Sequence, residues 1–120
     1  MTPTSFAFTL TMPGDERFVG AIRLLAAQAA SYAQLPAEAG EALAGHVQQA
    51  TETAIAASGS ASIPLEFTFS GDEAHLAVRI GCDLPQSAAA PASSGDDGVS
   101  VNWQAEGSRL TCTIQRPTAG

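Results

Sequence analysis

The sequence predicts an α+β fold, a two-layer α/β sandwich in which two helices pack on one face of a mainly antiparallel five-stranded sheet. Apolar residues recur at spacings of three and four in the segments 16–35 and 36–58, but alternate with polar residues in five other segments. Each alternating segment has a single apolar phase, so one face of the sheet is buried and the two amphipathic helices are the available cover. The 120 residues provide one domain, with the expected order β-α-α-β-β-loop-β-β.

The first predicted strand runs from Ser5 to Met12, with its apolar phase formed by Phe6, Phe8, Leu10 and Met12. Pro13-Gly14 ends this strand. A helix is expected from Glu16, and the residues at helical spacing that should share its buried face are Phe18, Ile22, Leu25, Ala29 and Tyr32. Leu35-Pro36 ends that helix, because the residue before a proline avoids helical dihedral angles.

A second helix is expected to begin at Pro36 and to end near Ser58-Gly59-Ser60. The residues predicted to form its buried face are Leu43, Val47, Ala50, Ala54 and Ala57. These small side chains favour a close approach of the helix to its neighbours.

Two hairpins are expected in the second half of the chain, one on either side of a loop. The apolar phase of the first hairpin is Ile63, Leu65, Phe67 and Phe69, followed by Ala74, Leu76, Val78, Ile80 and Cys82. The apolar phase of the second hairpin is Val99, Val101, Trp103 and Ala105, followed by Leu110, Cys112 and Ile114. Between them, residues 83–98 (DLPQSAAAPASSGDDG) are rich in Pro, Ala, Ser, Gly and Asp, which indicates a flexible loop.

The charge balance excludes several kinds of partner. The chain has five arginines, no lysine and twelve carboxylates, for a net charge of −7. Such a surface repels polyanions, so nucleic acid and anionic membranes are not expected partners. The sequence contains no apolar run long enough to span a bilayer and no recognisable signal peptide, and a bacterial cytoplasmic location is expected.

The cysteines and histidines do not form a recognisable metal or catalytic motif. Cys82 and Cys112 are thirty positions apart, and both lie on the apolar phase of predicted strands. Buried free thiols are expected, with a disulfide as the alternative if the two strands are neighbours. His46 and His75 lack companions at metal-ligand spacing and are expected to be structural, so we expect neither a metal site nor a catalytic residue.

An aromatic-Val-x-x-Ile-Arg segment, Phe18 to Arg23, opens the first predicted helix. Together with the order of elements and the stretch from Met12 to Ser58, it resembles the anti-sigma-factor serine kinase branch of the histidine-kinase-like ATPase superfamily. The resemblance covers roughly Phe6 to Asp83 and implies a reduced histidine-kinase-like ATPase fold.

The chain departs from that family at the residues that bind ATP. In the family, a Glu on the second helix positions water, and an Asn four residues later coordinates the magnesium ion that bridges the nucleotide phosphates. The aligned positions are Gln49 and Thr53. An amide cannot act as a general base, and a lone hydroxyl is a poor substitute for an Asn carbonyl on Mg²⁺.

The family's Asp-x-Gly-x-Gly motif, whose Asp binds the adenine amino group, aligns with a segment in which only Asp83 is retained. Leu84 and Pro85 replace glycines of that motif. Residues 83–98 occupy the position in the sequence where the family has a glycine-rich ATP lid. Gln49, Thr53 and Asp83 are therefore vestigial cofactor-binding candidates, or ordinary polar residues that happen to align. No cofactor is expected, with magnesium and ATP as the alternative.

These departures predict a non-catalytic, degenerate anti-sigma-factor-like domain that acts by protein–protein interaction in bacterial regulation. The resemblance implies a sigma factor or an anti-sigma antagonist as partner. It also implies a homodimer, and because a half-polar sheet of short strands leaves edges that can pair, we expect the dimer to use the outer sheet face or a strand edge. The alternatives are an ATP-binding anti-sigma serine/threonine kinase or nucleotide sensor with an atypical site, and an accessory domain that only dimerises.

Overall fold

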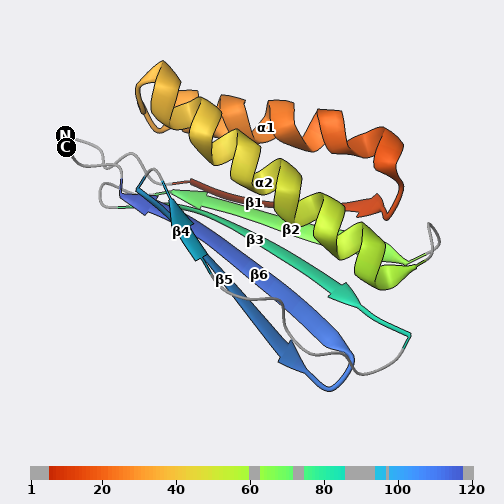
Figure 1. The fold of residues 1–120 in the computed structure, drawn as a ribbon. Coiled ribbons are helices and arrows are strands. Elements are labelled where there is room, and N and C mark those ends of the chain that lie inside the picture. The colour runs from red at the N-terminus through yellow and green to blue at the C-terminus, as the bar shows by residue number, and fades with distance from the viewer. Residues whose placement is uncertain (1–5, 60–62, 72–74, 86–93, 97, 118–120) are drawn as a thin grey trace.

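The computed structural model describes residues 6–59, 63–71, 75–85, 94–96 and 98–117. Its elements, in chain order, are β1 (Phe6–Pro13), a short 3₁₀ helix η1 (Glu16–Phe18), α1 (Val19–Tyr32), α2 (Ala37–Ser58), β2 (Pro64–Gly71), β3 (His75–Asp83), β4 (Ser94–Asp96), β5 (Val99–Glu106) and β6 (Arg109–Pro117). The predicted α+β sandwich is confirmed, with both helices on one face of an antiparallel sheet (Figure 1).

The strands lie side by side in the order β1-β2-β3-β6-β5-β4, and every neighbouring pair is antiparallel. The five predicted strands are present, and β4 is a short addition inside the segment predicted as a loop. Three residues are too few to show an alternating pattern in the sequence, whereas pairing of Ser94–Asp96 with Val99–Val101 defines the strand. Of the rest of that segment, residues 86–93 and 97 lie outside the described part of the chain.

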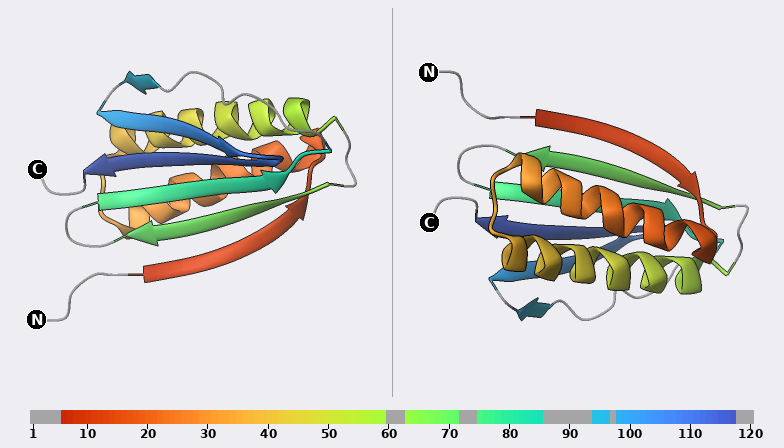
Figure 2. Two further views of the ribbon diagram at one scale, coloured as in Figure 1. Left: turned by 90° about the horizontal axis from the view of Figure 1, so that it is seen from below. Right: turned by 90° about the horizontal axis from the view of Figure 1, so that it is seen from above.

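The core lies between the helices and the inner face of the sheet. α2 contacts β3, β5 and β6, and α1 packs along α2, while β1 lies outside the helical layer (Figure 2). The largest fully buried side chains come from both layers: Phe67, Phe69, Ile22, Leu43, Leu65, Leu76, Ile80, Leu110, Ile114, Val47, Val78 and Val99. The predicted apolar phases of β2, β3, β5 and β6 are confirmed, except that Ala74 lies outside the described residues.

The predicted buried faces of the helices need two corrections. Tyr32 is 63% exposed, and Ala57 is exposed as well. Tyr32 lies at the end of α1, where its ring meets Phe6 edge-on with ring centroids 5.0 Å apart. The buried face of α1 is turned toward α2, where a Cβ added to Gly40 would be only 3.3 Å from the Cβ of Ala30. The covered side of α1 is therefore the side that meets α2, and Tyr32 lies outside it.

The helix ends follow from local chemistry. Phe18 belongs to η1 and not to α1. Asp15 is the N-cap of η1, and its side chain accepts a hydrogen bond from the backbone N–H of Arg17 at 3.0 Å. The hydrogen bonds from Arg17 lower the pKa of the Asp15 carboxyl. Gly59, with φ of 68°, ends α2 in the left-handed conformation that glycine adopts without strain. The predicted end of the second helix is confirmed.

Both cysteines are buried and free, as predicted. β3 and β6 are neighbours, but Cys82 lies opposite Leu110, and Cys112 lies opposite Ile80. The two thiols are therefore diagonal neighbours, where Cα atoms are about 7–8 Å apart and too distant for an unstrained disulfide. Burial raises the pKa of both thiols, that of Cys112 to about 12.

None of the described helices is long and apolar enough to cross a membrane.

Candidate interaction face of the sheet

The sheet face that turns away from the helices consists mainly of polar side chains. The pairing register arranges them in rows across the strands, one of which is Thr9, Thr68, Arg79, Thr113 and Asn102. The next row is Thr11, Glu66, Gly81, Thr111 and Gln104. Hydroxyl, amide and guanidinium groups from five strands therefore share one surface.

Arg109 organises one end of this polar face. Its Nη2 lies 3.2 Å from Oε1 of Glu66, and its Nη1 lies 3.4 Å from Oδ1 of Asp83. Because β3 lies between β6 and β2, the Arg109 side chain must cross β3 to reach Glu66, and it does so over Gly81. Gly81 leaves room for this crossing, and the result is an ion-pair cluster that joins three strands.

Arg79 is the second cation on the polar face. It is exposed and makes no ion pair within the described part of the chain. Its neighbours across the strands are the hydroxyl residues Thr68 and Thr113. Arg79 is thus a guanidinium with its hydrogen-bond donors available to a partner, next to side chains that can both donate and accept.

A shallow hollow of about 330 Å³ lies over this region. Its lining is polar or charged apart from one glycine, and comprises Glu66, Thr68, Arg79, Gly81, Gln104, Glu106, Arg109, Thr111 and Thr113. Small-molecule sites are usually enclosed and mostly apolar, with a few placed polar groups. An open hollow of mixed charge is better suited to the polar surface of another protein.

The sequence-predicted candidates do not converge on one site. Gln49 and Thr53 are exposed neighbours on α2, and the Thr53 hydroxyl donates a 2.9 Å hydrogen bond to the Gln49 carbonyl. Asp83 is on the outward phase of β3, with its side chain 77% exposed and paired to Arg109. The sheet therefore separates Asp83 from Gln49 and Thr53. Among the described residues no group of three His, Cys, Asp or Glu side chains could hold a metal ion.

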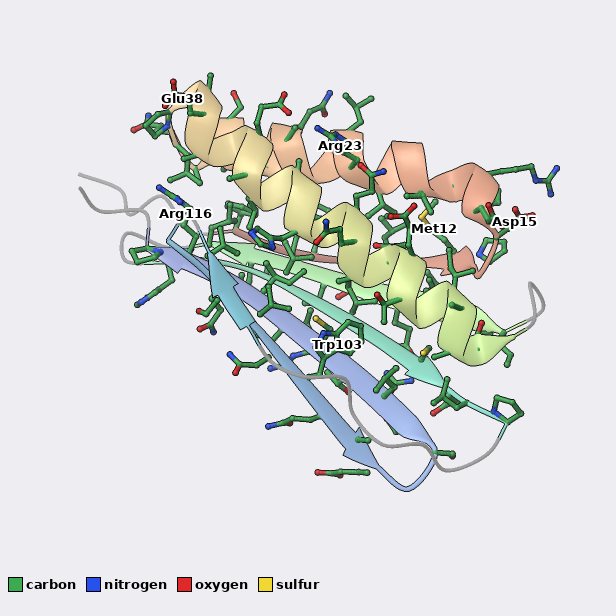
Figure 3. The ribbon with its side chains drawn as sticks, in the orientation of Figure 1. Met12, Asp15, Arg23, Glu38, Trp103 and Arg116 are labelled. Atoms are coloured by element: carbon green, nitrogen blue, oxygen red, sulfur yellow. The ribbon has the colours of Figure 1, made fainter. Side chains whose placement is uncertain are left out.

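Trp103 and the two histidines do not add a binding site to this face. Trp103, on β5, is partly buried against the core, which agrees with its predicted inward phase (Figure 3). His75 is exposed at the start of β3, and His46 is half-buried on α2.

The alternation of the strands does not distinguish Glu66, Arg79 and Arg109 from other outward residues. Alternation shows which residues face outward, but the cluster depends on which strands are neighbours. The one usable signal is that Arg79 and Arg109 are two of only five cations in the chain and both fall on the polar phase.

No model of a known protein family matches the chain, and no curated protein matches it either.

Proposed function

We propose that this protein is a non-catalytic, anti-sigma-factor-like domain that acts in bacterial regulation by binding a protein partner through the polar face of its sheet. The observation that carries the proposal is the position of Asp83. Its carboxylate pairs with Arg109 on one side of the sheet, whereas Gln49 and Thr53 lie on the helical layer. This separation does not favour one nucleotide contacting both groups of residues.

The described surface also offers little to a polyphosphate. Binding ATP requires backbone N–H groups, a metal ligand or a basic clamp to offset several negative charges. The Thr53 hydroxyl already donates a hydrogen bond to the Gln49 carbonyl, and Arg109 already pairs with two carboxylates. A single remaining contact from Asp83 to adenine is worth about 1 kcal/mol, far below what micromolar affinity requires.

The polar face supplies what a protein partner needs. Arg79 is available to pair with a carboxylate or a backbone carbonyl, and the surrounding hydroxyl and amide groups can donate and accept hydrogen bonds. The resemblance to anti-sigma-factor kinases points to a sigma factor or an anti-sigma antagonist as the partner.

Nucleotide binding is tested by the melting temperature of the purified protein with and without millimolar Mg-ATP. We expect no shift, whereas a ligand at 100 times its Kd would add about 2.7 kcal/mol and raise the melting temperature by several degrees. A shift of that size that disappears in Asp83→Ala would establish a nucleotide sensor and overturn the non-catalytic proposal.

Partner binding is tested by titrating the protein with each sigma factor and anti-sigma antagonist of its source cell, with calorimetry as the readout. We expect one saturable complex that is weakened at least tenfold by Arg79→Glu. The matched control is Arg17→Glu, which changes the charge equally at a site 83% exposed in η1. Equal weakening by both variants would show a charge effect without a role for the polar face, and binding to none of these proteins would overturn the anti-sigma assignment.

A further inference from the structure

β1 is an edge strand without the features that usually prevent edge pairing. It is the terminal strand of the sheet and is eight residues long (FAFTLTMP), with no charged side chain and a proline only at its last position. Edge strands are normally protected by charges, bulges or short length, since their free N–H and C=O groups attract other strands. Within the described residues, no strand covers the outer edge of β1.

An apolar groove lies beside this edge, between β1 and α1. Its lining is apolar apart from one amide and one hydroxyl, and consists of Phe6, Phe8, Leu25, Gln28, Ala29 and Tyr32. Phe8 is 42% exposed although it belongs to the inward phase of β1. The helical layer therefore stops short of β1 and leaves its inward side chains partly uncovered (Figure 2).

The two elements that border this groove carry little charge. Neither β1 nor α1 contains an Asp or Glu, although the chain has twelve such residues. The one cation of α1, Arg23, is turned to α2, where it bonds Gln48 at 2.6 Å and Glu41 at 2.9 Å (Figure 3). Two copies with net charge −7 repel each other, and a contact between elements without carboxylates adds least to that repulsion.

We propose that a second copy of this chain occupies the flank, with the two β1 edges paired antiparallel about a twofold axis at Thr9. The proposal does not depend on the function proposed above. An antiparallel pair places directly opposite side chains on the same face of the sheet, so the alternation of β1 restricts the register. With Thr9 opposite Thr9, Phe8 meets Leu10 and Phe6 meets Met12 on the helix side. The pattern of β1 is then complementary to itself, as a twofold interface requires.

The oligomeric state is the first test. Sedimentation equilibrium of the full chain is expected to show a dimer in the micromolar range. Thr9→Lys places two like charges opposite each other without entering the core, and we expect it to raise the dimer Kd about three- to tenfold at low salt. Ser100→Lys is the matched control, because Ser100 is also exposed on the polar face but lies on β5, away from β1. A monomer at all concentrations, or equal effects of both variants, would overturn the proposal.

The register is tested by disulfide cross-linking, which is simple here because the native cysteines are buried. Thr9→Cys should form a covalent dimer on mild oxidation, since opposite Cα atoms in an antiparallel pair are about 4.5–5.5 Å apart. Ala7→Cys and Thr11→Cys should each remain monomeric on denaturing gels, but should cross-link when mixed, because Ala7 lies opposite Thr11 in this register. Cross-linking of Thr113→Cys in place of Thr9→Cys would show that the copies meet through the polar face and would overturn edge pairing, as would a dimer in which Thr9→Cys does not cross-link.

Discussion

The guanidinium of Arg109 lies over Gly81, so closely that a Cβ added to Gly81 would be 2.6 Å from Nη2. This glycine lets a side chain of β6 reach Glu66 on β2 at 3.2 Å. An exposed ion pair of this kind contributes about 0–1 kcal/mol to stability, so the crossing shapes the polar face more than it stabilises the fold.

The crossing predicts that substitutions at Gly81 and Arg109 are coupled. Gly81→Ala alone should change the free energy of unfolding by less than about 1 kcal/mol. Alanine loses less conformational entropy on folding than glycine, but its Cβ displaces the Arg109 guanidinium, and the two effects oppose each other. In an Arg109→Ala background the same change should stabilise the protein by about 0.5–1 kcal/mol. Urea unfolding of the four proteins measures the coupling, and strict additivity would show that Arg109 does not lie over Gly81 in solution.

Two glycines of α2 should respond differently to alanine. A Cβ at Gly45 meets nothing within 4 Å, so Gly45→Ala should stabilise the protein by about 0.5–1 kcal/mol through helix propensity. A Cβ at Gly40 would lie 3.3 Å from Ala30, and Gly40→Ala should therefore gain less than Gly45→Ala or destabilise the protein. Thermal unfolding of both variants gives the comparison, and a larger gain at Gly40 would contradict the close packing of α1 on α2.

Alkaline pH should destabilise the fold through the buried thiols. The pKa of Cys112 is raised by burial from 9.0 to about 12, so between these values the unfolded chain loses a proton that the folded chain retains. The free energy of unfolding should fall by up to about 1.4 kcal/mol per pH unit from this thiol as pH rises above 9. Cys112→Ala should show a shallower decline in urea unfolding at pH 8, 9 and 10, and identical slopes would contradict the shift.

Thiol reactivity should report the same burial. A thiol reagent such as dithionitrobenzoate should label Cys82 and Cys112 slowly at pH 8 in the native protein and rapidly in denaturant, because both are buried and both pKa values are raised. Thr113→Cys, on the open face, serves as a positive control for native labelling. Labelling of the native cysteines as fast as this control would place at least one of them outside the core.

Local pattern was sufficient to predict most of the fold. Alternation placed Phe67 and Phe69 inward on β2, and helical spacing placed Leu43 and Val47 inward on α2, as the structure confirms. Both the alternation and the helical spacing indicate which side of a single element meets the core. The errors at Tyr32 and Ala57 lie at the margins of the helices, where coverage depends on the size and tilt of the neighbouring element and not on residue type.

The candidate site was predicted less well, because a shared surface depends on strand order and register. Gln49 and Thr53 were correctly expected to lie together on one helix, since positions four apart share a face. Asp83 was aligned with them through a family motif, but its side chain follows the outward phase of β3 and pairs with Arg109. No motif in the sequence indicates the Glu66–Arg109 pair, which joins positions 43 apart.

The sequence by itself determined the types of the two α-helices and the five longer strands, the inward phase of each of these strands and the end of α2 at Gly59, because these depend on local dihedral preferences and on periodicity. Only the tertiary structure decided that β3 and β6 are neighbours, that Arg109 crosses Gly81 to Glu66, and that β1 lies beyond the cover of α1. The physical reason is that backbone hydrogen bonding between strands is the same for every residue pair. The choice among possible strand orders is made by how well the whole core packs, which no single segment encodes.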